Sequence, residues 1–165
     1  MYFVGIITSD KSRKYINSIV KNQIKSEKFR IIFITEKNAE NMKNIRFDTI
    51  VINKEVKWLD IIQNNLKNIN LILNSDLQID FNRLKGNNLR IINYGFNSKA
   101  TITLSSNTDD GVQICIQRNI MNKKENIEQQ EISLMKNQSS DIYDIMLLIT
   151  ILLMYDKNKI KFLKL

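Results

Sequence analysis

Continuous runs of apolar residues, separated by helical patterns, dominate the first half of the chain. These runs occupy residues 2–8, 29–35, 49–53 and 69–74. Because they do not alternate with polar residues, they are typical of strands buried on both faces of a parallel sheet. Behind Ser9 and Asp10, which can cap a helix, apolar residues recur at helical spacing, and a second helical face follows the third run. Strands and helices that alternate over short links predict a Rossmann-like, mostly parallel α/β sheet flanked by helices.

The pattern changes after Asn74. A short polar turn at residues 74–76 leads to a helical turn near Phe81 and then to a further strand at residues 89–94. Residues 100–106 and 112–118 alternate apolar and polar positions, and the turn sequence Asp109-Asp110-Gly111 lies between them. This arrangement predicts a β-hairpin.

The last quarter of the chain begins with another alternating stretch, at residues 127–134. With the two hairpin strands, it makes three strands that we expect to be antiparallel and of edge type. Residues 142–155 are apolar nearly all round, so they predict a well-buried helix capped by residues 139–141. Residues 157–165 alternate basic and apolar positions and predict a final edge strand or a loose tail.

No internal repeat or linker interrupts the sequence, so we expect one domain over residues 1–165. Residues 1–76 form its βαβ half, and residues 77–165 supply antiparallel strands and the closing helix.

Composition narrows the chemistry available to this chain. It has 165 residues, 43% of them apolar, a net charge of +8, no histidine and a single cysteine, Cys115. Histidine-based catalysis, histidine–metal sites, an intrachain disulfide and a multi-cysteine zinc site are therefore excluded. The first ten residues lack the features of a signal peptide, and the longest apolar run is too short to cross a bilayer. We expect a cytoplasmic protein without a transmembrane segment.

Three segments in sequence order carry a resemblance to a known family. Residues 73–76 (LNSD) resemble a strand-ending Asn-x-Asp segment that lies near a nucleotide base. Residues 90–95 (RIINYG) resemble a later strand that ends in Tyr/Phe-Gly before an antiparallel hairpin. Residues 140–145 (SDIYDI) resemble an Asn-Val-Tyr-Asn-Ala-Leu helix opening, with Asp141 and Asp144 in place of the asparagines. The chain thus resembles the central domain of the Mur ligases, most closely over residues 70–155, which implies descent from ATP-dependent amide ligases of peptidoglycan precursor synthesis.

The sequence departs from that family where ATP would bind. The family's first strand runs into a phosphate-binding loop of the type Gly-Thr-Asn-Gly-Lys-Thr, whereas residues 7–13 read ITSDKSR. Without glycines the backbone does not easily wrap a phosphate, and Asp10 places a negative charge where the triphosphate would lie. Lys54 beside Glu55 argues against a displaced magnesium ligand. The family's metal-binding histidine and its C-terminal domain have no counterpart in this sequence.

Four residues remain as nucleotide-binding candidates: Lys11, Ser12, Asn74 and Asp76. Lys11 and Ser12 imitate the end of a Walker motif. Asn74 and Asp76 follow a central strand, at the sheet edge where open α/β sheets bind ligands. The competing interpretation, which we favour, is that Asn74 and Asp76 satisfy backbone groups in a turn.

The sequence therefore predicts a non-catalytic, Mur ligase-like binding or scaffold module, with no catalytic residue, metal or cofactor. A regulatory role in cell-wall synthesis is implied by the resemblance alone. We expect a protein partner or a second copy of the chain, bound through exposed strand edges or through the surface left bare by the missing domains of the family. The alternatives are a residual ATP-binding protein that uses the four candidate residues and a basic protein that binds an anionic polymer. The basic residues between 11 and 30 are spread around a helix, so nucleic acid is not expected as the partner.

Overall fold

The computed structural model describes residues 1–80, 88–122, 125–135 and 140–164. Eight strands form one sheet in the order β10-β7-β6-β5-β4-β3-β1-β2. Its five N-terminal strands are mutually parallel, which confirms the prediction for the first four and adds the strand at residues 90–94 to the parallel set. They are β1 (Tyr2–Ile7), β2 (Phe29–Phe33), β3 (Thr49–Ile52), β4 (Asn70–Asn74) and β5 (Arg90–Tyr94).

The remaining strands extend the sheet beyond β5. Strand β6 pairs parallel with β5 at one position, and β6, β7 and β10 then pair antiparallel. The predicted hairpin is confirmed, because β6 and β7 are joined at a turn closed by the Thr108 N–H and the Gly111 carbonyl. A separate pair of short strands, β8 and β9, lies outside this sheet. The bounds are β6 (Ile102–Asn107), β7 (Gly111–Ile116), β8 (Ile120–Met121), β9 (Asn126–Ile127) and β10 (Gln130–Met135).

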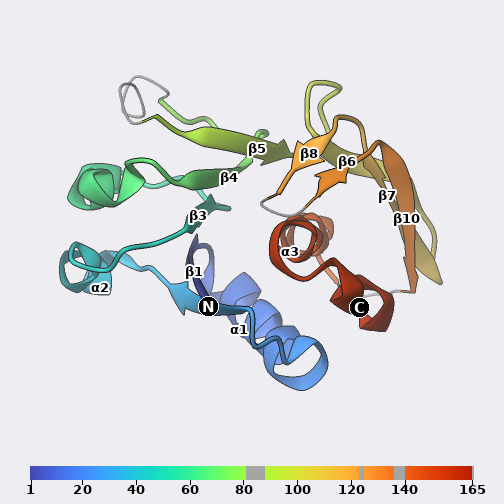
Figure 1. Cartoon of the computed structure of the whole chain (residues 1–165), viewed down its shortest axis with the longest axis horizontal. Coiled ribbons are helices and arrows are strands. Elements are labelled where there is room, and N and C mark those ends of the chain that lie inside the picture. Colours follow the sequence, from blue (N-terminus) through green and yellow to red (C-terminus); the bar gives the residue numbers. More distant parts are fainter. Residues whose placement is uncertain (81–87, 123–124, 136–139, 165) are drawn as a thin grey trace.

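Helices cover both faces of the parallel strands (Figure 1). On one face, the sheet curves around α3, which packs beside α1 in the larger apolar core. On the other face, α2 and η2 close a smaller core. The bounds are α1 (Asp10–Ile19), the π-helical turn η1 (Val20–Ile24), α2 (Glu36–Met42), the 3-10 segments η2 (Leu59–Leu66) and η4 (Lys157–Phe162), and α3 (Ile142–Tyr155).

The central helix α3 has the predicted bounds and burial. Eleven of its fourteen residues are buried, and Asp141 caps its first turn by accepting the Tyr143 N–H. The hydroxyl of Thr150, its one buried threonine, donates to the Met146 carbonyl at 2.7 Å. The helix therefore fills the sheet's concave side without an unpaired hydroxyl. No helix in the described ranges has both the length and the apolarity to cross a bilayer.

Several sequence expectations need correction. Residues 127–134 are not one strand, because Ile127 ends β9 and β10 begins at Gln130. The segment after α3 is neither a strand nor a loose tail but the 3-10 segment η4, whose Ile160 is buried in the core. Strands β6 and β7 are interior, so only β10 is an edge strand of this half, and β2 is the other edge. Helix α2 had no predicted counterpart, and the helical turn expected near residue 81 lies outside the described residues.

Candidate functional site

The link between β1 and α1 has no room for a phosphate-binding loop. Only Thr8 and Ser9 separate the two elements. The Ser9 side chain accepts a hydrogen bond from the Ser12 N–H at 3.1 Å. A phosphate at the start of this helix would need the same N–H as a donor. The Ser9 hydroxyl also lies 3.0 Å from the Ser12 hydroxyl. The structure thus has a capped helix where the resemblance implies an ATP-binding loop.

A hydrogen-bonded network lies beside this link, at the carboxyl ends of β1, β3 and β5. Asn53 is its centre: its Nδ2 donates to Thr8 Oγ1 and to Asp144 Oδ1, both at 3.1 Å. Its Oδ1 accepts the hydroxyl of the fully buried Tyr94 at 2.6 Å. Every polar group in this network therefore has a partner from a different element of the fold.

Asp144 is the unusual member of the network, because its carboxyl group is buried. The pKa of Asp144 is raised to about 6, mainly by burial and to a smaller extent by the nearby charge of Asp141. Hydrogen bonds with Ser12 and Asn53 and the charge of Lys11 act in the opposite direction. The sequence carried one signal of this site, since Asp144 stands where the resembling helix opening has asparagine.

A second cluster forms around Asp76. Its Oδ2 accepts the Phe96 N–H at 2.7 Å and the Tyr143 hydroxyl at 3.1 Å, and its Oδ1 accepts Asn97 Nδ2 at 2.9 Å. Partial burial acts to raise the pKa of Asp76, but these hydrogen bonds outweigh it, and the pKa lies below its usual value. Burial, together with the hydrogen bond to Asp76, raises the pKa of Tyr143 to about 12. A Cβ at Gly95 would lie 2.8 Å from Asp76 Oδ2, so glycine permits this close approach.

The four sequence candidates lie at this edge but do not form one site. Ser12 belongs to the Asp144 network, and Lys11 is exposed. Asn74 is buried, and its Oδ1 accepts the Asp76 N–H at 3.0 Å, which is the turn role that the sequence favoured. The edge gathers the carboxylates of Asp76, Asp141 and Asp144, which disfavour a polyphosphate. Nucleotide binding by these residues stays a prediction.

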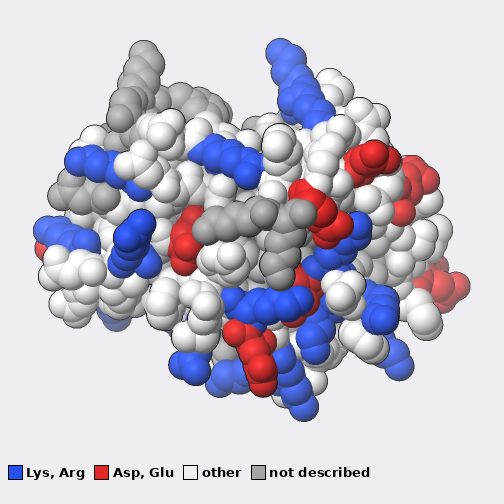
Figure 2. All heavy atoms as spheres, viewed as in Figure 1, with Lys and Arg blue, Asp and Glu red and all other residues white. Residues whose placement is uncertain are grey.

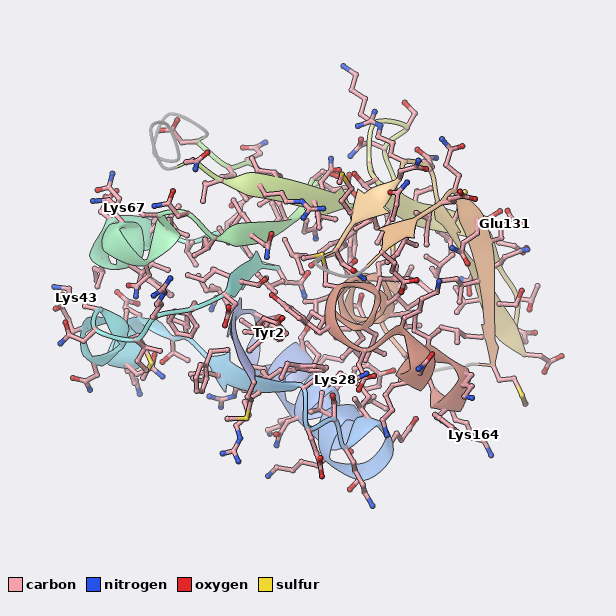
Figure 3. The ribbon with its side chains drawn as sticks, in the orientation of Figure 1. Tyr2, Lys28, Lys43, Lys67, Glu131 and Lys164 are labelled. Carbon is pink, nitrogen blue, oxygen red and sulfur yellow. The ribbon has the colours of Figure 1, made fainter. Side chains whose placement is uncertain are left out.

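The opposite edge of the sheet, at the amino ends of the parallel strands, carries a groove of about 740 Å³. Four cationic side chains line it: Lys43, Arg46, Lys67 and Arg90. Asp48 is the only carboxylate among the described lining residues. In Figure 3, Tyr2 lies near the middle of the view, with Lys43 and Lys67 to its left and Lys28 to its lower right. Figure 2 shows Lys and Arg side chains distributed across the same view. We call this feature the amino-edge groove.

Asn65 holds the loop that brings two of these cations to the groove. Its Nδ2 donates to the carbonyls of Met42, Lys43 and Ile45, at 3.1, 3.2 and 2.7 Å. The Oδ1 of Asn65 is buried and has no hydrogen-bond partner in the described part of the chain. Since one side chain binds three carbonyls of the loop backbone, Lys43 and Arg46 are presented from a preorganised segment.

Two further asparagines form the rim between Lys67 and Arg90. Asn68 and Asn88 each lie two residues before a strand and have a positive φ, 56° and 48°. Asparagine tolerates this left-handed conformation better than other residues with a side chain. Asn88 Nδ2 donates to Asn68 Oδ1 at 3.0 Å, which joins the entries to β4 and β5.

A second groove of about 250 Å³ continues the first. The two grooves share Tyr2, Asn70, Arg90 and Tyr155. The second groove adds Lys28, paired with Asp156, and Lys157, whose Nζ lies 3.7 Å from Glu125 Oε2. Sequence reasoning missed this surface, because its cations come from loops far apart in the chain, each with one or two basic residues.

Comparison with known proteins supplies no relative. The sequence matches no protein-family model and no curated protein. The likeness to the Mur ligase central domain therefore remains a resemblance, carried by the three segments quoted above.

Proposed function

We propose that this chain is a non-catalytic binding module that takes an anionic ligand in the amino-edge groove. The observation that carries the proposal is the charge of the groove, with four cations and one carboxylate among its described lining residues. This proposal joins the expected binding module with the anionic-polymer alternative. A regulatory role in cell-wall synthesis would be a refinement supported only by the sequence resemblance.

The cations of the groove are available to a ligand. Lys43 pairs with Glu40 on the same helix end. In the described ranges, no carboxylate forms an ion pair with Arg46, Lys67 or Arg90. Guanidinium groups bind phosphate and carboxylate in a bidentate manner, and a recessed groove with one sign of charge concentrates anions. The three unpaired cations therefore favour an anion with several charges.

The arrangement at the carboxyl edge supports the non-catalytic part of the proposal. Its polar side chains hydrogen-bond one another, and Asp76, Asp141 and Asp144 repel the phosphates of ATP. A nucleotide bound there would have to displace the Ser9 cap and the Asn53 network.

Binding of fluorescently labelled inorganic polyphosphate, followed by anisotropy, tests this proposal. We expect the affinity to fall on the order of tenfold or more between about 50 and 200 mM salt. The double variant Arg46→Glu/Arg90→Glu should bind about tenfold or more weakly than the wild type. The matched control is Lys14→Glu/Arg118→Glu, which changes two exposed cations outside the groove. Each substitution changes the charge by −2, so both variants lower the net charge from +8 to +4.

Equal loss of affinity in the two double variants would show that only net charge matters and would refute a groove site. Thermal unfolding with millimolar Mg-ATP gives a second check on the carboxyl edge. A bound ligand at about 100 times its Kd adds roughly 2.7 kcal/mol to the free energy of unfolding, which such a measurement detects. A stabilisation of this kind that requires magnesium and disappears in Lys11→Ala would show that the protein binds nucleotide at the carboxyl edge.

A further inference from the structure

We propose that the ligand of the amino-edge groove is a single strand of nucleic acid. This inference rests on the proposed function, because it names the kind of anion that the groove takes. It departs from the sequence expectation, which weighed the basic residues between 11 and 30 and between 157 and 164 but not the four cations that line the larger groove. Three observations carry it: the continuity of the two grooves, the unpaired amide groups on the rim, and the aromatic pair where the grooves meet.

The groove is elongated. The larger volume, about 740 Å³, runs into the smaller, about 250 Å³, through four shared residues. The cations of the larger part run from Lys43 and Lys67 to Arg90 at the junction, and in the smaller part Lys28 and Lys157 each pair with a carboxylate. An extended chain with a charge on each unit can contact the whole series, whereas a single compact anion can contact only part of it.

The rim offers acceptors as well as donors. The hydrogen bond between Asn88 Nδ2 and Asn68 Oδ1 leaves Asn68 Nδ2 and Asn88 Oδ1 without a partner in the described part of the chain. A phosphate chain has only acceptor atoms, so it cannot use the free oxygen of Asn88. The edge of a nucleobase presents donors and acceptors together, and asparagine amides pair with such edges.

An aromatic pair lies at the junction of the two grooves. The rings of Tyr2 and Tyr155 are 4.8 Å apart, and both residues line both grooves. Both are partly exposed. Positive grooves that contain aromatic rings are the usual binding surfaces for single strands. The bases of a single strand are free to stack on exposed ring surface, whereas those of a duplex are stacked on one another, so the aromatic pair favours a single strand over a double helix.

The test compares several polyanions on the same protein by anisotropy. The main probe is a labelled oligothymidylate of about 12 nucleotides, which spans the site sizes usual for single-strand binding. Its competitors are a duplex that contains the same strand, inorganic polyphosphate and a poly-glutamate peptide. We expect the single strand to bind about tenfold or more tightly than each competitor at equal salt, because base contacts add to phosphate contacts.

Two variants separate base contacts from charge. Asn68→Gly/Asn88→Gly removes both rim amides, and glycine accepts the positive φ at both positions. It should weaken the single strand several-fold and polyphosphate less, because a phosphate chain can use only the Nδ2 of Asn68 and not the Oδ1 of Asn88. Arg46→Glu/Arg90→Glu should weaken both probes, while Lys14→Glu/Arg118→Glu should weaken neither by more than about twofold.

The outcomes distinguish this inference from the function on which it rests. If polyphosphate, duplex or poly-glutamate binds as tightly as the single strand, and Arg46→Glu/Arg90→Glu still weakens binding, the nucleic-acid inference is overturned and the anion-binding module stands. The same conclusion follows if the asparagine variant weakens polyphosphate as much as oligothymidylate. If no polyanion binds, both are overturned.

Discussion

The two edges of the parallel sheet differ in what their polar residues do. At the carboxyl edge, Asn53, Asp76 and Asp144 bond to neighbouring side chains and backbone, and the edge is acidic. At the amino edge, Arg46, Lys67 and Arg90 have no ion pair in the described ranges, and the surface is hollowed. Since parallel α/β sheets usually bind ligands at the carboxyl edge, the contrast shows that a fold alone does not place a site. We therefore expect carboxyl-edge substitutions to change stability and amino-edge substitutions to change binding.

The largest stability effect should come from Asp144→Asn, measured against pH. Because the folded pKa is about 6 and the usual value is 3.8, the folded state keeps a proton that the unfolded chain loses between these values. Stability due to Asp144 therefore falls as the pH rises through this window, by up to roughly 3 kcal/mol, and is constant above it. Chemical unfolding should show the variant more stable than the wild type at pH 8 and nearly equal at pH 4. A difference that does not change with pH would contradict this account.

Tyr94→Phe should cost about 1–2 kcal/mol of unfolding free energy. The substitution removes the hydroxyl that donates to Asn53 Oδ1 and leaves that oxygen without its donor inside the network. Tyr143→Phe is the matched control, because its hydroxyl donates to the exposed Asp76 and its loss should cost about 0.5 kcal/mol. Equal costs in denaturant unfolding would show that the buried network is no tighter than the outer cluster.

Gly95→Ala should cost about 1 kcal/mol. The new Cβ would lie 2.6 Å from Ser75 Oγ and 2.8 Å from Asp76 Oδ2, so these side chains would have to move. Their movement weakens the hydrogen bonds from Phe96 and Asn97 to Asp76. Thermal unfolding of Gly95→Ala, Asp76→Ala and the double variant provides the check. The loss of unfolding free energy in the double variant should be smaller than the sum of the two single losses, since both substitutions disrupt one cluster.

The smallest stability effect should come from Arg46→Glu/Arg90→Glu, within about 0.5 kcal/mol of the wild type. Both side chains are exposed, and neither has an ion pair to lose in the described part of the chain. The same variant should bind anions about tenfold or more weakly. A large loss of stability would show that these arginines stabilise the folded state, which would contradict the expectation that amino-edge substitutions change binding and not stability.

Local patterns predicted the fold well and the surfaces poorly. The four continuous apolar runs placed β1 to β4, and the apolar segment at 142–155 became α3 with the same bounds. The pattern at 127–134 misled, because alternation over eight residues does not reveal the break between β9 and β10. Helix α2 escaped notice, since its seven residues bury only Ala39 and so lack an apolar stripe.

The candidate sites were harder to predict, because they depend on residues brought together from distant positions. Asn53 and Asp144 are 91 residues apart, so the aspartate at position 144 could be noticed in the sequence but its partner could not. Arg46 and Lys67 come from two separate loops and Arg90 from the start of β5, so no local charge run marked the amino-edge groove. Asn74 was interpreted correctly as a turn residue, since its role depends only on Asp76 two positions later.

A titration with oligothymidylate, followed by backbone amide chemical shifts, shows whether the ligand binds at the amino edge or at the carboxyl edge of the sheet. We expect the largest shift changes at residues 43–48, 67–70 and 88–90, which enclose the amino-edge groove. The amide shifts of residues 8–12, 74–76 and 95–97 should change little. They should also change little when Mg-ATP is added in place of the oligonucleotide. Changes concentrated at those carboxyl-edge residues would contradict this expectation and would place the binding site at the edge that open α/β sheets usually use.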